Sequence, residues 1–163
     1  MAQTMLARNA VSAKMAECFI TIPNEQGVDE TYNFMSAINL EATFEKSKTE
    51  IPILGRMNKG HKATGSNITG SAEFHFNTSI WRKLAYRFQQ TGEDIYFDIL
   101  IKNEDITASE IGKQTIILRD CNLDSTLLAK FDADSDDVLT ESIDFTAEGF
   151  ELPEEFNTMA GML

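Results

Sequence analysis

The stretch INLEATFEK, residues 38–46, decides the fold class because apolar and polar side chains alternate along it. Successive side chains of an extended chain point to opposite faces, so residues two apart share a face. The apolar face of this stretch consists of Ile38, Leu40, Ala42 and Phe44. A period of two predicts a β-strand with one buried face and one solvated face.

Five further stretches repeat this alternation. The clearest are NITGSAEFHF, residues 67–76, and DIYFDILIK, residues 94–102. Weaker examples are MAECFITI at 15–22, KQTIILRDCNL at 113–123 and LTESIDFTA at 139–147. The pattern therefore predicts six strands, and their hairpin-like spacing favours antiparallel pairing.

One segment, TSIWRKLAYRFQQTG at 78–92, has the period of a helix. Its apolar side chains gather on one arc and comprise Ile80, Trp81, Leu84, Ala85 and Phe88. Thr78 or Ser79 can cap its start, and Gly92 can adopt the left-handed conformation that ends it. The expected fold is mainly β with one α-helix: an antiparallel barrel or sandwich of about six strands with the helix covering one apolar face.

Length and composition fit one domain. The chain has 163 residues and 42% hydrophobic content, which suffices for one core. We expect a single domain over 1–163, with an N-terminal arm (1–13), a long inter-strand loop (46–65) and a C-terminal tail (150–163). No apolar run reaches the ~18 residues that cross a bilayer, and the start lacks the apolar segment of a signal peptide. The sequence therefore predicts a protein made in a cytoplasm, without membrane binding.

The charges are unevenly distributed. The formal net charge is -12, and from Asp120 to Glu155 twelve acidic residues stand against the single base Lys130. Such acidity argues against a protein that grips a nucleic-acid backbone, because that binding needs cations that neutralise phosphates. Five of the 14 Lys and Arg residues instead lie within residues 46–62. The basic middle and the acidic end could complement each other within one subunit or between copies.

The expected loop over 46–65 combines charge, turn residues and apolar residues. Pro52 prevents ordinary strand pairing across its middle, and its glycines allow turns. Loops longer than about 12–15 residues in compact domains are usually functional or disordered. An apolar cluster argues against disorder and needs a cover, because exposed it would be adhesive; its members are Ile51, Ile53, Leu54 and Met57.

Motifs for nucleotide and metal binding are incomplete. GHKATGSN has the glycine spacing of a phosphate-binding loop, but Ser66 stands where that motif needs Lys and a strand follows where a helix is needed. DADSDD offers three calcium-loop positions, yet Asp137 replaces the required Gly and Ile143 the bidentate Glu. Cys18 and Cys121 have no second ligand at metal spacing and are expected in the core. We therefore expect no cofactor and no metal.

Catalytic patterns are equally incomplete. The two histidines, His61 and His75, lie in no triad or metal spacing and are expected at the surface. Glu41 and Glu73 could form a carboxylate pair on neighbouring strands, but a solvated sheet face carrying many acids explains them more simply. We expect no catalytic residues and no enzyme.

The segment from Glu45 to Gly70 carries a specific pattern, EK.K.E...LGR...GHK.TG.N.TG. With ARNAVSAK at 7–14, NLDS at 122–125 and FTAEGFELPEEF at 145–156, it resembles the tail tube proteins of contractile-tailed bacteriophages, in the branch typified by the PBSX-like defective prophage. This branch also includes phage-tail-like bacteriocins. The resemblance covers nearly the whole chain. It departs from the common pattern at NAVSAK, where relatives often carry Gly, and at GRMNKG, where a second Arg is frequent.

The resemblance implies a structural protein whose hexameric rings stack into the hollow inner tube of a contractile tail. The implied partners are further copies of the chain and the sheath, baseplate and tape-measure proteins, with DNA only as passing cargo. The implied location is the virion tail or a tail-like particle. The loop would reach neighbouring subunits and the adjacent ring through Lys46, Lys48, Ile51, Pro52, Ile53, Leu54, Gly55, Arg56, Met57, Lys59 and Lys62.

The polar sides of the strands suggest how such a tube would pass DNA. If the apolar sides face the core, the polar sides can line a wet channel. The candidates for the lumen wall are Asn39, Glu41, Thr43, Thr69, Ser71 and Glu73. Because duplex DNA carries one phosphate charge per roughly 1.7 Å, a polar to acidic wall would let it slide without binding.

Two other kinds of protein fit part of the sequence. A tube protein of a bacterial secretion or injection system would share the ring architecture, and so would the tube of a headless bacteriocin. A small ligand-binding β-barrel or hydrolase would need a closed apolar cavity or a convergent polar site. Neither of those features is evident in the pattern.

Overall fold

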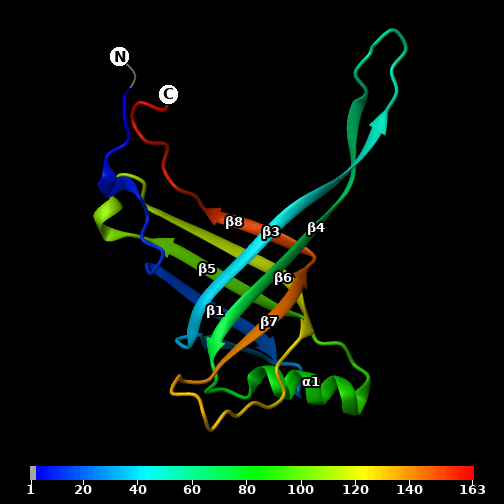
Figure 1. Ribbon diagram of the computed structural model, residues 1–163, viewed down its shortest axis with the longest axis vertical. Helices are drawn as coiled ribbons and strands as arrows, with labels where there is room; N and C mark the ends of the chain where they lie inside the picture. Colours follow the sequence, from blue (N-terminus) through cyan, green and yellow to red (C-terminus); the bar gives the residue numbers. More distant parts are fainter. Residues whose placement is uncertain (1–2) are drawn as a thin grey trace.

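The computed structural model describes residues 3–163 and contains eight strands and one α-helix within them. Their order matches the predicted mainly β fold (Figure 1). The elements are β1 (Ala16–Pro23), β2 (Asp29–Asn33), β3 (Ala37–Ile51), β4 (Gly60–His75), α1 (Ile80–Thr91), β5 (Phe97–Glu104), β6 (Lys113–Ser125), β7 (Thr140–Ala147) and β8 (Gly149–Glu154). Short 3₁₀ turns lie at Ala7–Asn9 and Ile106–Ala108.

All strand pairs are antiparallel, in the order β2-β1-β5-β6-β7-β4-β3, and β8 also pairs with β6. We call β2, β1, β5, β6 and β8 sheet A, and the end of β6 with β7, β4 and β3 sheet B. The long strand β6 belongs to both. It pairs with β8 up to Arg119, with β5 up to Cys121 and with β7 from Asn122. Asp120, with φ 52°, lies at this change of partner.

The core lies between the two sheets, whose strands cross in Figure 1. It unites the apolar sides of β1, β5 and β6 with those of β4 and β7. At the end covered by α1, Trp81 packs against the rings of Phe34, Phe74 and Phe97, each with its centroid 5.5 Å from the indole. Burying each large apolar side chain contributes about 1.5–3 kcal/mol, so the molecule is a sandwich held by its interior.

The helix forms as predicted, with one difference in its buried arc. It ends at Gly92, whose φ is 71° and whose N–H donates to the Phe88 carbonyl at 2.8 Å. At the start, the Ser79 side chain makes no capping bond, and Thr78 Oγ1 accepts from the Ile80 amide at 3.4 Å. Trp81 and Leu84 are buried, whereas Phe88 is 54% exposed because the last turn extends beyond the sheets.

Three segments differ from the sequence prediction. The expected loop 46–65 is largely strand, since β3 continues to Ile51 and β4 begins at Gly60. Part of the expected C-terminal tail is strand β8. The strand β2 was also missed, because all five of its residues are exposed and show no apolar alternation. The first two residues of the expected N-terminal arm lie outside the described residues. No helix among residues 3–163 is long and apolar enough to span a membrane.

Candidate assembly surfaces

Sheet B presents a polar face on the side away from the core. Antiparallel register places residues of β3, β4 and β7 in rows across it. The rows are Asn39, Glu73 and Ser142; then Glu41, Ser71 and Asp144; then Thr43, Thr69 and Thr146. Asn39 Nδ2 donates to Glu73 Oε2 at 3.0 Å, which ties two of the strands together. All six residues predicted from sequence as lumen candidates therefore lie on this one polar face.

The polar face also contains residues that the sequence reasoning missed. Ser142 and Asp144 come from β7, and a shallow groove of about 420 Å³ adds Asp124 from β6. The alternation in LTESIDFTA already placed Ser142 and Asp144 opposite the apolar residues. What sequence could not supply was the pairing of β7 with β4. The three rows carry Glu41, Glu73 and Asp144 and no Lys or Arg, so this face is acidic.

The second candidate surface is the hairpin arm, which we define as residues 46–65. It projects from the sandwich as the extended ends of β3 and β4 (Figure 1). β4 pairs with β7 only from Ile68 onward, so no third strand supports the arm. Pairing continues to Ile51 opposite Gly60, and only residues 52–59 form the connecting loop. A bulge at Ser47/Lys48 interrupts the register, and Thr64 Oγ1 donates to the Ser47 carbonyl there at 3.3 Å.

The tip of the arm exposes the apolar cluster predicted from sequence. Leu54 and Met57 are fully exposed, and Ile51 and Ile53 are partly exposed. The turn closes at Gly55, with φ 82°, and the Arg56 amide donates to the Ile53 carbonyl at 3.2 Å. All eleven residues predicted for subunit contact lie on this arm. None of residues 3–163 covers its tip, because Leu54 and Met57 are fully exposed there.

Comparison with known proteins identifies the family. The family model described as "Phage tail tube protein" matches residues 3–154. The phage-like element PBSX protein XkdM of Bacillus subtilis strain 168 is 34% identical over 151 residues, which are 93% of this chain and 95% of that protein. The chain belongs to the phage tail tube protein family. The resemblance seen in the sequence is thus confirmed, and the role of the chain is structural.

Solved structures share the fold of this tail tube protein. A chain of the anti-feeding prophage baseplate superposes with a TM-score of 0.59 at 15% identity, covering 88% of this chain and 94% of that chain. A chain of the sheath-tube complex of an extracellular contractile injection system, in its extended state, gives 0.59 at 14% identity, covering 83% and 86%. At such identities the comparison establishes the shared fold, which confirms the predicted fold class.

The two chain ends of the tail tube protein meet at the connection between β5 and β6 (Figure 1). Glu110 accepts hydrogen bonds from both ends, from Asn9 Nδ2 at 2.8 Å and from the Ala160 amide at 3.3 Å. Asp105 accepts from the Ser12 and Thr107 amides at 2.9 and 3.0 Å, and these bonds lower the pKa of its carboxyl. The described part of the N-terminal arm is therefore fastened to the body.

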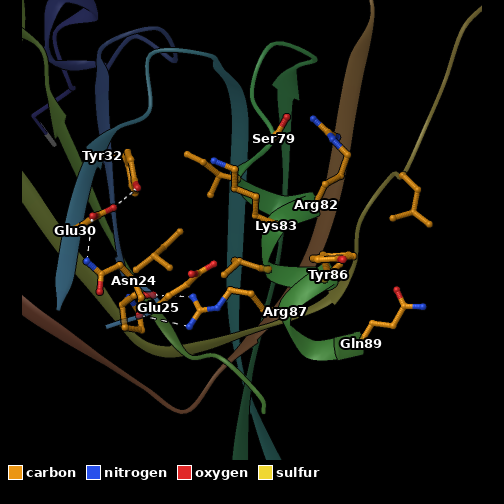
Figure 2. Close-up of a pocket in the computed structure, with 16 residues that line it drawn as sticks. Asn24, Glu25, Glu30, Tyr32, Ser79, Arg82, Lys83, Tyr86, Arg87 and Gln89 are labelled. Atoms are coloured by element: carbon orange, nitrogen blue, oxygen red, sulfur yellow. Dashed lines mark hydrogen bonds between the residues drawn. The ribbon is translucent and has the colours of Figure 1, made fainter. Parts of the chain in front are cut away.

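A groove of about 770 Å³ lies between α1 and the β1–β2 turn and tests the ligand-binding alternative (Figure 2). Three of its five charged side chains, Glu30, Arg82 and Arg87, bond to the protein itself. Glu30 accepts from Tyr32 Oη at 2.5 Å and from Asn24 Nδ2 at 3.2 Å, which lowers the pKa of the Glu30 carboxyl and raises that of Tyr32. Arg87 donates to the Pro23 carbonyl at 3.0 Å. Because the groove is open and most of its charged side chains are paired within the protein, it gives no support to the ligand-binding alternative.

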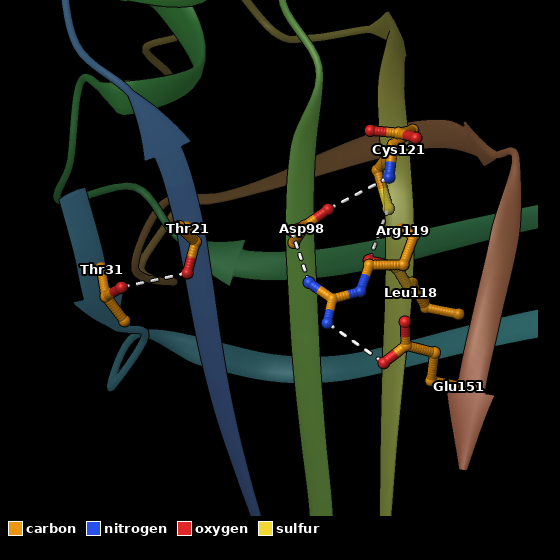
Figure 3. A network of polar contacts seen from close by, with 8 residues as sticks. Thr21, Thr31, Asp98, Leu118, Arg119, Cys121 and Glu151 are labelled. Atoms are coloured by element: carbon orange, nitrogen blue, oxygen red, sulfur yellow. Dashed lines mark hydrogen bonds and ion pairs between the residues drawn. The ribbon is translucent and has the colours of Figure 1, made fainter. Parts of the chain in front are cut away.

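The outer surface of sheet A is held by a bridging arginine (Figure 3). Arg119 on β6 donates to Glu151 on β8 at 3.1 Å and to Asp98 on β5 at 2.9 Å, and both bonds raise the pKa of its guanidinium. This contact fastens β8 onto the sheet. Burial raises the pKa of the Cys121 thiol, on the same strand as Arg119, to about 12, and that of the Cys18 thiol on β1 to about 11. Cys121 is buried and Cys18 half-buried, which agrees with the predicted core role.

Proposed function

We propose that this tail tube protein forms hexameric rings that stack into the hollow inner tube of a contractile phage tail or tail-like particle. The polar face of sheet B lines the lumen, and the hairpin arm joins subunits. The sheath surrounds the tube, and baseplate and tape-measure proteins start it and set its length. The protein is made in the host cytoplasm, has no catalytic activity, and contacts DNA only as cargo that passes through.

The acidic polar face of sheet B is the observation that carries this proposal. Three antiparallel strands align hydroxyl, amide and carboxylate groups in rows, with no cation among them. A wall built this way stays hydrated and repels phosphates, whose spacing in duplex DNA is roughly 1.7 Å per charge along the axis. A face meant to hold DNA would need Lys or Arg, as backbone binding does. This face suits transit instead.

The hairpin arm supplies the second support. An exposed apolar tip on an unsupported two-stranded ribbon is costly for a monomer and adhesive in solution. Contact with other copies removes both costs. A contact between different surfaces of identical subunits propagates, giving closed rings or open filaments according to its geometry.

Electron microscopy of the purified chain tests the proposal, across a series of protein and salt concentrations. The matched variant replaces residues 47–65 by Asn-Gly, which joins the paired residues Lys46 and Ser66 through a two-residue turn. We expect rings or hollow tubes from the intact chain and monomers from the shortened one. Identical monomers from both chains, even when a baseplate is supplied as a nucleus, would contradict the proposal.

A tube of an injection system that delivers other cargo is the second candidate. It is favoured by the fold shared with chains of the anti-feeding prophage and of the extracellular contractile injection system. The gene neighbourhood separates the two candidates, because capsid genes beside sheath and baseplate genes indicate a complete phage.

A further inference from the structure

The hairpin arm and the loop between β6 and β7 lie at opposite ends of the longest axis of the molecule (Figure 1). We call residues 126–139 the basal loop. Beyond the last residue supported by β7, β3 continues for seven residues (45–51) and β4 for eight (60–67), which is roughly 25 Å at 3.3 Å per residue. An arm that projects so far from the body cannot fold back onto its own basal loop. It can reach only another molecule.

Both ends expose large apolar side chains. On the arm these are Leu54 and Met57, with relative exposures of 102% and 100%. On the basal loop they are Leu128, Phe131 and Val138, with 69%, 90% and 75%. Removing apolar surface from water contributes about 25 cal/mol per Å², so burying the two sets against each other is favourable.

The basal loop also lines an open hollow of about 490 Å³. Its lining combines the apolar side chains of Phe131, Ala133 and Val138 with Asp132, Asp137 and the single base Lys130. A concave site of apolar and mainly acidic groups suits an apolar side chain flanked by a cation. The tip of the arm has that form, since Arg56 stands between Leu54 and Met57 in the chain.

The charges of the two ends are opposite. The arm has five cations and one carboxylate, Glu50, for a net charge of +4. The basal loop has four aspartates and Lys130, for a net charge of -3. Opposite potentials steer association and fix the register of an interface.

We propose that the hairpin arm of one tail tube subunit docks on the basal loop of a subunit in the next ring, with Leu54 and Met57 entering the hollow. The inference rests on the proposed stacking of rings and names the receiving surface. The contact is heterologous, with different patches on each partner, and lies along the long axis of the molecule. It therefore repeats without closing, as a tube requires.

Charge reversal on each side tests this contact. One variant carries Lys48→Glu, Arg56→Glu and Lys62→Glu, which takes the arm from +4 to -2. The other carries Asp134→Lys and Asp136→Lys, which takes the basal loop from -3 to +1. None of these five side chains makes an ion pair among residues 3–163. The control, Glu93→Lys with Glu104→Lys, changes the net charge as much as the basal-loop variant does, at exposed sites elsewhere.

Each variant alone juxtaposes like charges, which cost several kcal/mol, so pelletable tube should fall at least about tenfold. A mixture of the two should restore tubes, because the acidic arm of one then meets the basic loop of the other, and the reverse pairing also matches. The control should assemble like the unmodified chain. Unimpaired assembly of either variant alone, or a mixture no better than its parts, overturns the proposal.

Disulfide trapping separates this inference from the proposed function. Chains with Met57→Cys are mixed with chains with Val138→Cys under mild oxidation, and Glu93→Cys replaces Val138→Cys in the control. A disulfide that forms only in the first mixture supports the contact even if no tube is visible. Tubes without this disulfide uphold the tube function and refute the receiving surface.

Discussion

The buried ion pair between α1 and β7 allows a sharp prediction about stability. Arg82 Nη1 donates to Glu141 Oε2 at 2.7 Å, and the Glu141 side chain has no solvent exposure. The guanidinium also donates to the carbonyls of Thr78 and Leu127 and lies 4.3 Å from the ring centroid of Phe76. The pair therefore ties the helix and the basal loop to sheet B.

Arg82 is partly exposed and Glu141 is fully enclosed, so removing one or the other should destabilise the fold to different extents. Arg82→Met leaves a carboxylate fully enclosed without its cation, and breaking a buried pair this way costs about 3–5 kcal/mol. Glu141→Met costs less, about 2–3 kcal/mol, because the guanidinium is 20% exposed and keeps its two carbonyls. The double variant should recover to within about 1 kcal/mol of the native protein, since apolar residues of similar volume often replace a buried pair without loss.

Urea unfolding followed by fluorescence measures these differences. Trp81 is the sole tryptophan, is fully buried and precedes Arg82 in the chain, so its emission reports the packing of the helix. The shortened-arm background keeps the chain monomeric during the measurement. At about 2–4 °C per kcal/mol for a chain of this size, Arg82→Met should lower Tm by about 6–20 °C. If Arg82→Met and Glu141→Met each lowered the free energy of unfolding only slightly, and their effects added in the double variant, the reasoning would be refuted. A buried ion pair predicts that the loss in the double variant is smaller than the sum of the two single losses.

Three other perturbations have defined outcomes. Gly70→Ala should cost about 1–3 kcal/mol in a denaturant titration, because its Cβ would lie 2.4 Å from an aromatic ring of β7, whereas Gly65→Ala meets nothing within 4 Å and should be nearly neutral. Glu41→Lys with Glu73→Lys should leave tubes intact but make them retain duplex DNA in co-sedimentation, and free passage would count against a lumen position. The carboxyl of Asp105 has a lowered folded pKa, so its stabilisation is present above the unfolded value of about 3.9 and is lost as pH falls through the folded value. Asp105→Ala should therefore speed amide exchange in the N-terminal arm at pH 7 and remove its acid sensitivity.

Local periodicity predicted the elements that have one buried side. In β7 and in the core-facing part of β4, from Ile68 to Phe74, alternate residues enter the core, so their burial is reflected in the order of residues. The same applies to α1 and its ending at Gly92. Glu141 shows that position can outweigh residue type. In LTESIDFTA it lies on the same side as Ile143 and Phe145, and it is buried with them although it is charged.

For β3, the edge strand of sheet B, the predicted strand formed but the prediction of a buried apolar side was wrong. Only Leu40 of that side packs against the core, while Ile38 and Phe44 are 45% and 48% exposed.

Elements held mainly by backbone pairing escaped prediction. The arm pairs through its main chain while both of its sides are solvated, so nothing selects alternating residues. For the same reason its strands tolerate Gly60 and Gly65. Pro52 does prevent further pairing, but it lies just beyond the last pair, Ile51 with Gly60, so the loop that it starts is short. Strand β8 contains Pro153, which is tolerated because no strand pairs with its other edge.

The acidic polar face and the basic arm place opposite demands on assembly. Outside the arm, the subunit carries a net charge of -16, given -12 for the whole chain and +4 for the arm. Bringing acidic faces together around a lumen costs repulsion, which salt reduces because the Debye length is about 8 Å at physiological ionic strength. The same salt weakens the attraction between arm and basal loop. Ring closure should thus gain from salt while stacking loses, and the apolar tip lets stacking persist, because burial of Leu54 and Met57 does not depend on charge.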